Sequence, residues 1–248
     1  MSRWKAAGIH LLISCSIGLI VGALLFGVWY PPPYFHAAGA DVLVLLLVSV
    51  DLTLGPLLTL VVFKSGKWGL RFDLALIAII QSAALVYGMS VVLRSRPVFL
   101  VAAVDRFVLV SASEIDDDDL SKGSKPEFRS LSWTGPRLAG AQIPSTWQER
   151  NTVLFSSIAG KDIDKYPQYF ADYAAAAPGL LKRAKPLDAL KVTDDDARKT
   201  LAAAIDKAGE PAERIVWVPL VARKANLVML LDRDSGKPLR AVPINPWK

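Results

Sequence analysis

The chain has 248 residues, of which 52% are hydrophobic, and its formal net charge is +6. A mean hydropathy of +0.34 is rare for a soluble protein of this length, and the apolar excess lies in the first 96 residues. Those residues hold seven Lys or Arg against three Asp, so the basic charge flanks apolar stretches and gives no reason to expect a nucleic-acid partner.

The residue types present argue against metal, cofactor or catalytic chemistry. A single cysteine, Cys15, excludes an intramolecular disulfide and any zinc site built on cysteines. His10 and His36 are predicted on opposite sides of a membrane and cannot form a ligand pair. The sequence contains no HExxH, GxSxG, P-loop or GxGxxG pattern. We therefore predict a protein without a metal, a cofactor or catalytic residues.

The first apolar run predicts a transmembrane helix over about residues 8–29. It is too long for the core of a signal peptide, and no small-residue cleavage motif follows it, so we expect an uncleaved anchor. Ser14, Gly18 and Gly22 repeat every four residues and form a small-residue face of the GxxxG type. This face can pack against the second helix of the same chain or against a helix of another protein.

The second apolar run predicts a span over residues 42–63, with Asp51 near its middle. An ionised carboxylate at that depth costs about 3 kcal/mol or more, and Pro56 leaves a backbone carbonyl without its helical partner. Lipid can satisfy neither group, so this helix should pack among others. Asp51, Gly55 and Thr59 recur every four residues and are predicted to share the inward face.

The third predicted span covers residues 72–93, where Gln81, Ser82 and Tyr87 are candidate partners for Asp51. Segments 1–96 and 97–248 thus divide the chain into a three-helix membrane region and an outer domain.

Charge asymmetry predicts the orientation. The loop between the first two spans has no Lys or Arg, whereas residues 64–71 contain three, and Arg3 and Lys5 precede the first span. Positive charge favours the cytoplasmic side, so the N-terminus is predicted there. Three spans then place residues 97–248 across the membrane, although Arg94 and Arg96 fall on that side against the rule.

The outer domain is predicted to have an α+β fold. Strand-like runs at 98–104 and 107–111 flank Asp105 and Arg106, which are expected as a bulge or a paired charge. Asp116–Asp119 is expected as a solvated loop or helix start rather than a calcium site. Residues 121–146 are rich in proline, serine and glycine, so we expect them to be irregular.

An aromatic helix face is predicted next. Its spacing of i, i+3, i+4 and i+7 is that of one helical face, which suits either core packing or partner binding. The residues on it are Tyr166, Tyr169, Phe170 and Tyr173.

The C-terminal part predicts one helix and an antiparallel β meander. The helix is expected to start at an N-cap, Thr193, and to stop at Gly209. Three strands follow, and Pro219 within the first suggests that this strand is an edge. Their predicted ranges are 214–222, 227–231 and 239–244.

Several of these segments together resemble the TfpX/TfpZ family of type IV pilin accessory proteins. The resemblance covers the whole chain and is strongest in the first 110 residues. It implies an inner-membrane protein of a pilus-bearing Gram-negative bacterium, encoded beside a pilin and supporting its assembly, with the outer domain in the periplasm. The family has no agreed catalytic mechanism, so no catalytic residue is carried over. The matching segments are Arg3-Trp4-Lys5-Ala6, Tyr30–Phe35, Asp51 with Gly55–Thr59, Arg96-Pro97-Val98 and Val104–Phe107.

The leading hypothesis is a non-enzymatic accessory factor that binds type IV pilin in the membrane and supports its stability or assembly. Pilin's apolar N-terminal helix and globular head match the division of this chain. Besides the lipid bilayer and the major pilin, other pilus assembly proteins are candidate partners. The predicted contact residues are Ser14, Gly18, Gly22, Asp51, Gly55, Pro56 and Thr59 in the membrane, and Asp105, Arg106, Tyr166, Tyr169, Phe170 and Tyr173 outside.

Two alternatives remain open at this point. One is a membrane enzyme that modifies pilin, with Asp51 or Asp105 as an acid/base group. The other is a proton-linked membrane regulator built around Asp51. The sequence does not predict the oligomeric state.

Overall fold

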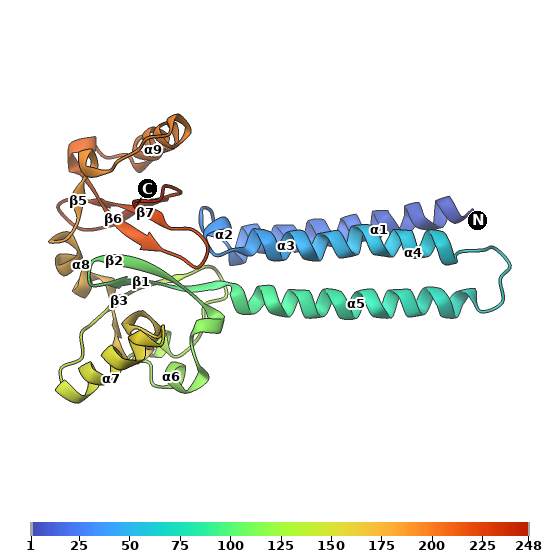
Figure 1. The fold of residues 1–248 in the computed structure, drawn as a ribbon, viewed down its shortest axis with the longest axis horizontal. Coiled ribbons are helices and arrows are strands. Elements are labelled where there is room, and N and C mark those ends of the chain that lie inside the picture. The colour runs from blue at the N-terminus through green and yellow to red at the C-terminus, as the bar shows by residue number, and fades with distance from the viewer. Residues whose placement is uncertain (1, 248) are drawn as a thin grey trace. The chain divides into compact units, whose positions relative to one another are not determined.

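A computed structural model describes residues 2–247 of the protein. They form two compact units (Figure 1). The first contains the chain up to Trp29 together with Ala40–Ser95. The second contains Tyr30–Gly39 and the chain from Arg96 onward. The loop between the first two apolar helices therefore belongs to the C-terminal unit.

Three helical stretches of the first unit are long and apolar enough to cross a bilayer. They are Arg3–Trp29, Ala40–Val62 and Leu70–Ser95, with mean hydropathies of 2.5, 2.2 and 2.1. The first consists of α1 (Arg3–Leu24) and a π-helical end, η1 (Leu25–Trp29), and the third is α5 (Leu70–Ser95). The prediction of three transmembrane-length helices is confirmed.

The second stretch changes its hydrogen-bond pattern just before Pro56. It runs through α3 (Ala40–Ser49), a π-helical turn η2 (Val50–Leu54) and α4 (Gly55–Val62). Pro56 lies in the first turn of α4, where its missing N–H and its ring would disturb the preceding turn of a regular helix. The wider π turn accommodates this disturbance, and Asp51 lies within it.

This second stretch packs against both of the others: α4 contacts α1 and α5, and α3 contacts α5. Thr59 Oγ1 lies 2.6 Å from Nδ1 of His10 on α1, in a hydrogen bond. On the α5 side, a Cβ built on Gly55 would lie 2.0 Å from Nε2 of Gln81. The absence of a side chain at Gly55 thus permits a contact that any larger residue would obstruct.

The C-terminal unit is built on a mixed sheet with the strand order β4-β3-β1-β2-β6-β7-β8 and with β5 paired to β6. β1 runs parallel to β3, and β2 runs parallel to β6, whereas the other pairs are antiparallel. The predicted α+β fold and its β6-β7-β8 meander are confirmed. The strands are β1 (Pro97–Ala103), β2 (Arg106–Ser111), β3 (Arg137–Ala141), β4 (Phe170–Ala171), β5 (Lys185–Pro186), β6 (Ile215–Val221), β7 (Leu227–Asp232) and β8 (Pro238–Val242).

Helices cover parts of this sheet and close two cores. One core contains Phe99 of β1 with Phe128 and Phe170, whose rings meet edge to face. The other joins Trp217 of β6 and Leu230 of β7 to α9. The helices are α2 (Tyr34–Ala37), α6 (Asp117–Ser121), α7 (Trp147–Ile158), α8 (Tyr173–Leu181) and α9 (Asp195–Ala208).

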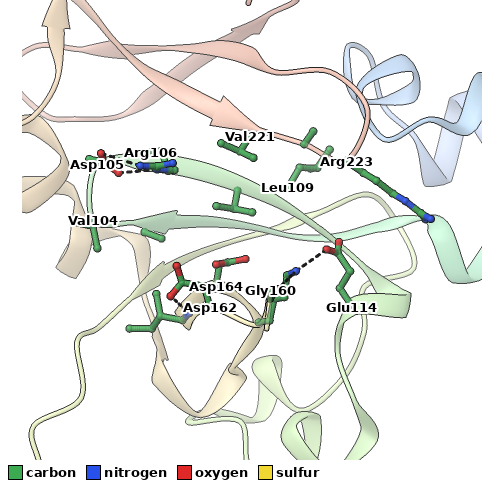
Figure 2. A pocket seen from close by; sticks show the side chains of 15 residues that line it. Val104, Asp105, Arg106, Leu109, Glu114, Gly160, Asp162, Asp164, Val221 and Arg223 are labelled. Atoms are coloured by element: carbon green, nitrogen blue, oxygen red, sulfur yellow. Dashed lines mark hydrogen bonds and ion pairs between the residues drawn. The ribbon is translucent and has the colours of Figure 1, made fainter. Parts of the chain in front are cut away.

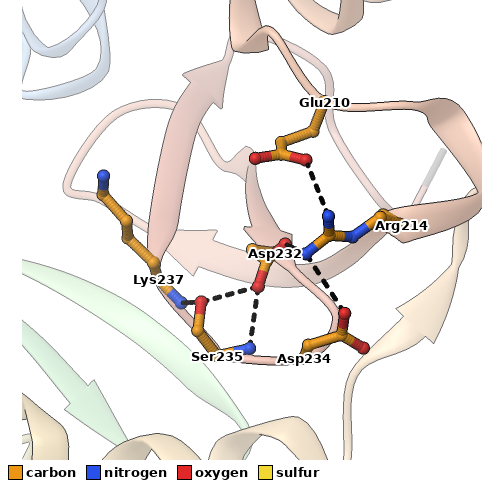
Figure 3. Close-up of polar contacts among 6 residues, drawn as sticks. All are labelled: Glu210, Arg214, Asp232, Asp234, Ser235 and Lys237. Atoms are coloured by element: carbon orange, nitrogen blue, oxygen red, sulfur yellow. Dashed lines mark hydrogen bonds and ion pairs between the residues drawn. The ribbon is translucent and has the colours of Figure 1, made fainter.

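An ionic network fixes the turn between β7 and β8 (Figure 3). Asp232 accepts hydrogen bonds from the backbone N–H and the hydroxyl of Ser235 at 2.7 and 2.6 Å. Arg214 pairs with Asp232 at 3.2 Å, with Asp234 at 3.1 Å and with Glu210 at 3.5 Å. The Ser235 hydrogen bonds, with help from Arg214, hold the pKa of Asp232 below its usual value.

The first residue of each segment of the C-terminal unit, Tyr30 and Arg96, is buried within that unit. Tyr30 has no exposed surface, and burial raises the pKa of its phenol. Arg96 is 5% exposed, donates from Nε to the carbonyl of Ser132 at 3.1 Å, and lies 4.7 Å from the ring centroid of Trp133. Arg96 is therefore part of the domain interior rather than a free charge beside a membrane.

The predicted aromatic helix face is wrong. Tyr166 is extended, with φ −118° and ψ 90°, because the residue before a proline is disfavoured in the helical region. Pro167–Tyr169 forms a short 3₁₀ turn, and Phe170 belongs to β4. A helix begins only at Tyr173, after its N-cap residue Asp172.

Pro219 does not mark an edge strand, because β6 lies between β2 and β7. On the side opposite β7, β6 pairs with β5 through residues 216 and 217 and with β2 through residues 220 and 221. Pro219 lies between these two pairings on that side, and it is paired with Val228 of β7 on the other side.

Two further predictions need correction. Residues 121–146 include a strand, β3, which contains no β-branched or aromatic residue and so lacks the usual strand signal. β3 is held by its pairing with β1 and by close packing of α8, since a Cβ on Gly140 would lie 2.5 Å from that of Ala176. The cap of α9 is Asp194 rather than Thr193, and the helix ends at Gly209 as predicted.

Candidate functional site

A cavity of about 550 Å³ opens in the C-terminal unit (Figure 2). It is bounded by the turn between β1 and β2, by the end of β6 and by the segment from Gly160 to Lys165. Charged side chains from all three parts line it, together with the aliphatic side chains of Val104, Val108 and Ile163.

The β1–β2 turn carries an unusual backbone conformation. Ala103 pairs with Arg106, so Val104 and Asp105 form a two-residue hairpin turn. Val104 has φ +56°, a region that a β-branched residue rarely occupies and that hairpin turns usually fill with glycine. Such strain concentrates at functional sites, and Val104 is half exposed at the cavity.

Most charges around the cavity are paired. Arg106 donates to both oxygens of Asp105, at 2.8 and 3.2 Å, and this hydrogen bonding lowers the pKa of Asp105. The predicted paired charge at this turn is confirmed. Lys165 Nζ lies 3.1 Å from Oε1 of Glu114 and donates to the carbonyl of Gly160 at 2.8 Å.

Asp164 differs from these residues. It is 6% exposed, and its carboxylate forms no ion pair with any residue in 2–247. Burial raises its pKa to about 6, and its own backbone N–H and Lys165 offset only part of this effect. The flanking lysines are engaged elsewhere: Lys161 with Asp116 and Asp119, and Lys165 with Glu114.

Sequence patterns did not single out Asp164, which carries no motif and has a lysine on either side within three residues. The folded structure directs both lysines to the segment that contains α6, which sequence spacing alone does not reveal.

The predicted aromatic residues of the outer domain lie in its interior contacts. Tyr166 and Tyr169 pack on a cluster with Ile163, and Phe170 is buried in the β1 core. Tyr173 donates its hydroxyl proton to the carbonyl of Gly236 at 2.5 Å and stacks on Phe107 at 5.7 Å. Of the six outer candidates, Asp105 and Arg106 line the cavity.

In the membrane-length helices, Asp51 is half buried and lines a second cavity of about 330 Å³. Its other walls come from α3 and α5, including Leu47, Tyr87 and Gly88. Within residues 2–247 the Asp51 carboxylate has no hydrogen bond or ion pair. Gln81, one of its predicted partners, lies against Gly55 instead.

Only part of the small-residue face of α1 packs against other residues of the described chain. Ser14 is 7% exposed, whereas Gly18 and Gly22 are intermediate in exposure. A Cβ built on either glycine would meet no atom of the described chain within 4 Å. Gly88, by contrast, would place a Cβ 2.3 Å from Cδ1 of Leu47.

No group of three or more His, Cys, Asp or Glu side chains within residues 2–247 is placed to hold a metal ion. The polar groups that line the two cavities are carboxylates, guanidinium groups, an amine and the phenol of Tyr87, among aliphatic side chains.

Comparison with known proteins identifies the family. Residues 1–39 match the family model described as fimbrial assembly protein FimB. Over 236 residues, the chain is 30% identical to the serogroup I and the serogroup E1 fimbrial assembly proteins of Dichelobacter nodosus, and each alignment covers 94% of this chain and 91% of the relative. A third relative, the fimbrial assembly protein of serogroups C1 and C2, is 36% identical over 118 residues, which is 47% of this chain and 90% of that protein. No solved structure matches the chain. With near full-length relatives of this kind, the chain belongs to the fimbrial assembly protein family.

Proposed function

We propose that this protein is an inner-membrane accessory factor of the TfpX/TfpZ type that supports the assembly of type IV pili by binding pilin. It acts by holding or handing over pilin subunits and not by catalysis. Family membership supports a role in pilus assembly, and the three apolar helices support a position in the membrane. The bound partner is the major pilin, whose apolar helix lies in the same bilayer.

The contrast among the glycines carries the proposal of a helix partner. The space beside Gly55 and Gly88 is occupied by side chains of this chain, whereas the space beside Gly18 and Gly22 on α1 is open. In lipid, helices associate through close van der Waals contact at small residues rather than through a hydrophobic drive. Open glycines at four-residue spacing therefore suit a second helix, and pilin supplies one of matching character.

The orientation follows from charge and from the outer loop. The 30–39 loop is part of the same compact unit as the C-terminal domain, so the two lie on the same side of the membrane. This agrees with three spans, because the loop follows the first span and the domain follows the third. The lysines and arginine of the 64–71 loop favour the cytoplasm for the opposite side. Arg96 weighs little against this rule because it is buried in the domain. The C-terminal domain is accordingly periplasmic.

A proton-linked regulator is the second candidate, and the environment of Asp51 favours it. An intramembrane carboxylate that borders a cavity and forms no ion pair or hydrogen bond within residues 2–247 is a common element of proton pathways.

A double substitution tests the proposed function. Gly18→Ile with Gly22→Ile should fill the open face without removing a charge or a polar group. Pilin crosslinks and surface piliation should fall while the protein keeps its normal abundance. Ala23→Ile is the matched control, because Ala23 is exposed on another face of α1. Unchanged pilin crosslinks and full piliation in the double variant would refute pilin binding at the small-residue face of α1. A change in the covalent mass of pilin in cells that lack the protein would instead favour an enzyme that modifies pilin.

A further inference from the structure

A deeply buried acid of the C-terminal unit borders the larger cavity and forms no ion pair within residues 2–247. Asp164 is 6% exposed, and Figure 2 shows its carboxylate within the cavity beside that of Asp162. Asp162 is more exposed and accepts a hydrogen bond from the N–H of Ile163 at 2.7 Å. Buried carboxylates are normally paired, so Asp164 is an exception that a bound cation would remove.

The basic residues that line the cavity form no ion pair with this carboxylate. Arg106 is held by two hydrogen bonds to Asp105, and Lys165 is held by Glu114 and the carbonyl of Gly160. The remaining lining base, Arg223, is exposed. The lining thus carries more acidic than basic groups, and Asp162 and Asp164, which form no ion pair within residues 2–247, lie next to each other (Figure 2).

The walls add a second requirement on the ligand. Aliphatic side chains line much of the cavity, and its volume of about 550 Å³ is in the range of small-molecule and side-chain pockets. Lysine and arginine combine an apolar stem with a charged end, so they bury the stem along such walls while the end meets a carboxylate. The lining aliphatic residues are Val104, Val108, Leu109, Ile163 and Val221.

We infer that this cavity receives a lysine or arginine side chain of pilin, whose ammonium or guanidinium group pairs with Asp164. This inference rests on the proposed function, since it takes pilin as the partner. Asp164 is already largely buried in the free protein, so the incoming cation gains a charge-assisted hydrogen bond with little further desolvation of the acid. The strained turn at Val104 and Asp105 forms part of the rim and is positioned to contact the same segment.

Binding of full-length pilin to the full-length protein in lipid nanodiscs tests the inference. The affinity at pH 7.5 should fall at least about tenfold for Asp164→Asn, because a buried ionic partner is lost while the side-chain shape is kept. Asp188→Asn is the matched control, since Asp188 is an exposed acid away from the cavity, and it should bind as the wild type does. Equal binding by the wild type and Asp164→Asn would overturn the cavity's role and leave the proposed function standing. A wild-type protein that does not bind pilin would overturn both.

A competition experiment with the wild type avoids any folding defect of the variant. Nα-acetyl-lysinamide should displace pilin at lower concentration than Nα-acetyl-norleucinamide, which has a similar stem but no charge. Equal competition by the two compounds would contradict recognition of a cation. If Arg223 instead serves as the internal partner of Asp164, then Arg223→Gln should change the thermal stability only when Asp164 is present, and pilin binding should not depend on Asp164.

Discussion

The carbonyl oxygen of Ala37 accepts a hydrogen bond from the backbone N–H of Lys224 at 2.9 Å, and the N–H of Ala225 approaches the same oxygen at 3.3 Å. This contact joins the loop between the first two apolar helices to the turn between β6 and β7. Gly39, with φ +79°, lies beside the same lysine, so its left-handed backbone belongs to the same contact. The loop and the C-terminal domain therefore form one folded unit.

Cysteine labelling in intact cells tests the resulting topology. In a Cys15→Ala background, Asp188→Cys should react with a membrane-impermeant thiol reagent once the outer membrane is permeable. Ser65→Cys, in the basic loop between the second and third helices, should react only after the inner membrane is opened. Both positions are exposed, so accessibility within the fold does not limit either reaction. The reverse labelling pattern would contradict the periplasmic placement.

The glycine contacts predict opposite effects of the same substitution. Gly55→Val should destabilise the helix bundle by roughly 1–3 kcal/mol, because the new Cβ would overlap the carboxamide of Gln81. Gly18→Val should be tolerated, since nothing in the described chain lies within 4 Å of its Cβ. Thermal unfolding in detergent and abundance in cells measure both. A loss of stability in Gly18→Val as large as in Gly55→Val would show that the chain's own helices fill that face.

The buried Asp164 predicts a pH-dependent gain in stability on substitution. Burial raises its pKa in the folded protein to about 6, above the usual 3.8 of an aspartate, so the folded state binds the proton more tightly than the unfolded state. Stability should therefore fall as the pH rises from 4 to beyond 6, by about 3 kcal/mol at 1.36 kcal/mol per unit of pKa. Asp164→Asn should lose this dependence and unfold at a higher temperature than the wild type at pH 8, with little difference at pH 4.

Thermal unfolding of the full-length protein, followed by tryptophan fluorescence at both pH values, measures this effect. Asp188→Asn should show the wild-type pH dependence. A variant that is less stable than the wild type at pH 8 would mean that Asp164 makes a stabilising contact as an anion.

Sequence patterns predicted the elements whose signal is local. The three apolar runs could be recognised because the bilayer demands length and hydropathy, and both are properties of a single segment. The β6–β8 meander had apolar strands separated by turn residues, and Gly209 ended α9 through its left-handed conformation.

Other features depend on partners distant in the chain. β3 is a strand because β1 and α8 hold it, and the spacing of Tyr166 and Tyr173 suggested a helix that Pro167 prevents. At the candidate site, Asp105 and Arg106 could be predicted as neighbours in sequence. Asp164 could not, since its isolation results from the long-range ion pairs of Lys161 and Lys165.

Substitution of Asp51 separates pilin binding from proton-linked function. Because its carboxylate has no hydrogen bond or ion pair within residues 2–247, both Asp51→Asn and Asp51→Leu should leave the protein's abundance unchanged. An accessory factor that works by binding should also keep its piliation in both variants. Loss of piliation in both variants at normal abundance, measured by pilus shearing and immunoblotting, would instead support a proton-linked role.

In-cell photocrosslinking tests the binding of pilin by α1 most directly. A photoreactive amino acid at position 15, which is exposed and borders the small-residue face without filling it, should crosslink to the apolar N-terminal helix of pilin. The same amino acid at position 20, which is exposed on the opposite face of the helix, should give little or no pilin adduct. Both variants should be produced at wild-type levels in cells that still make pili. Pilin adducts from position 20 but not from position 15, or from neither, would contradict the account.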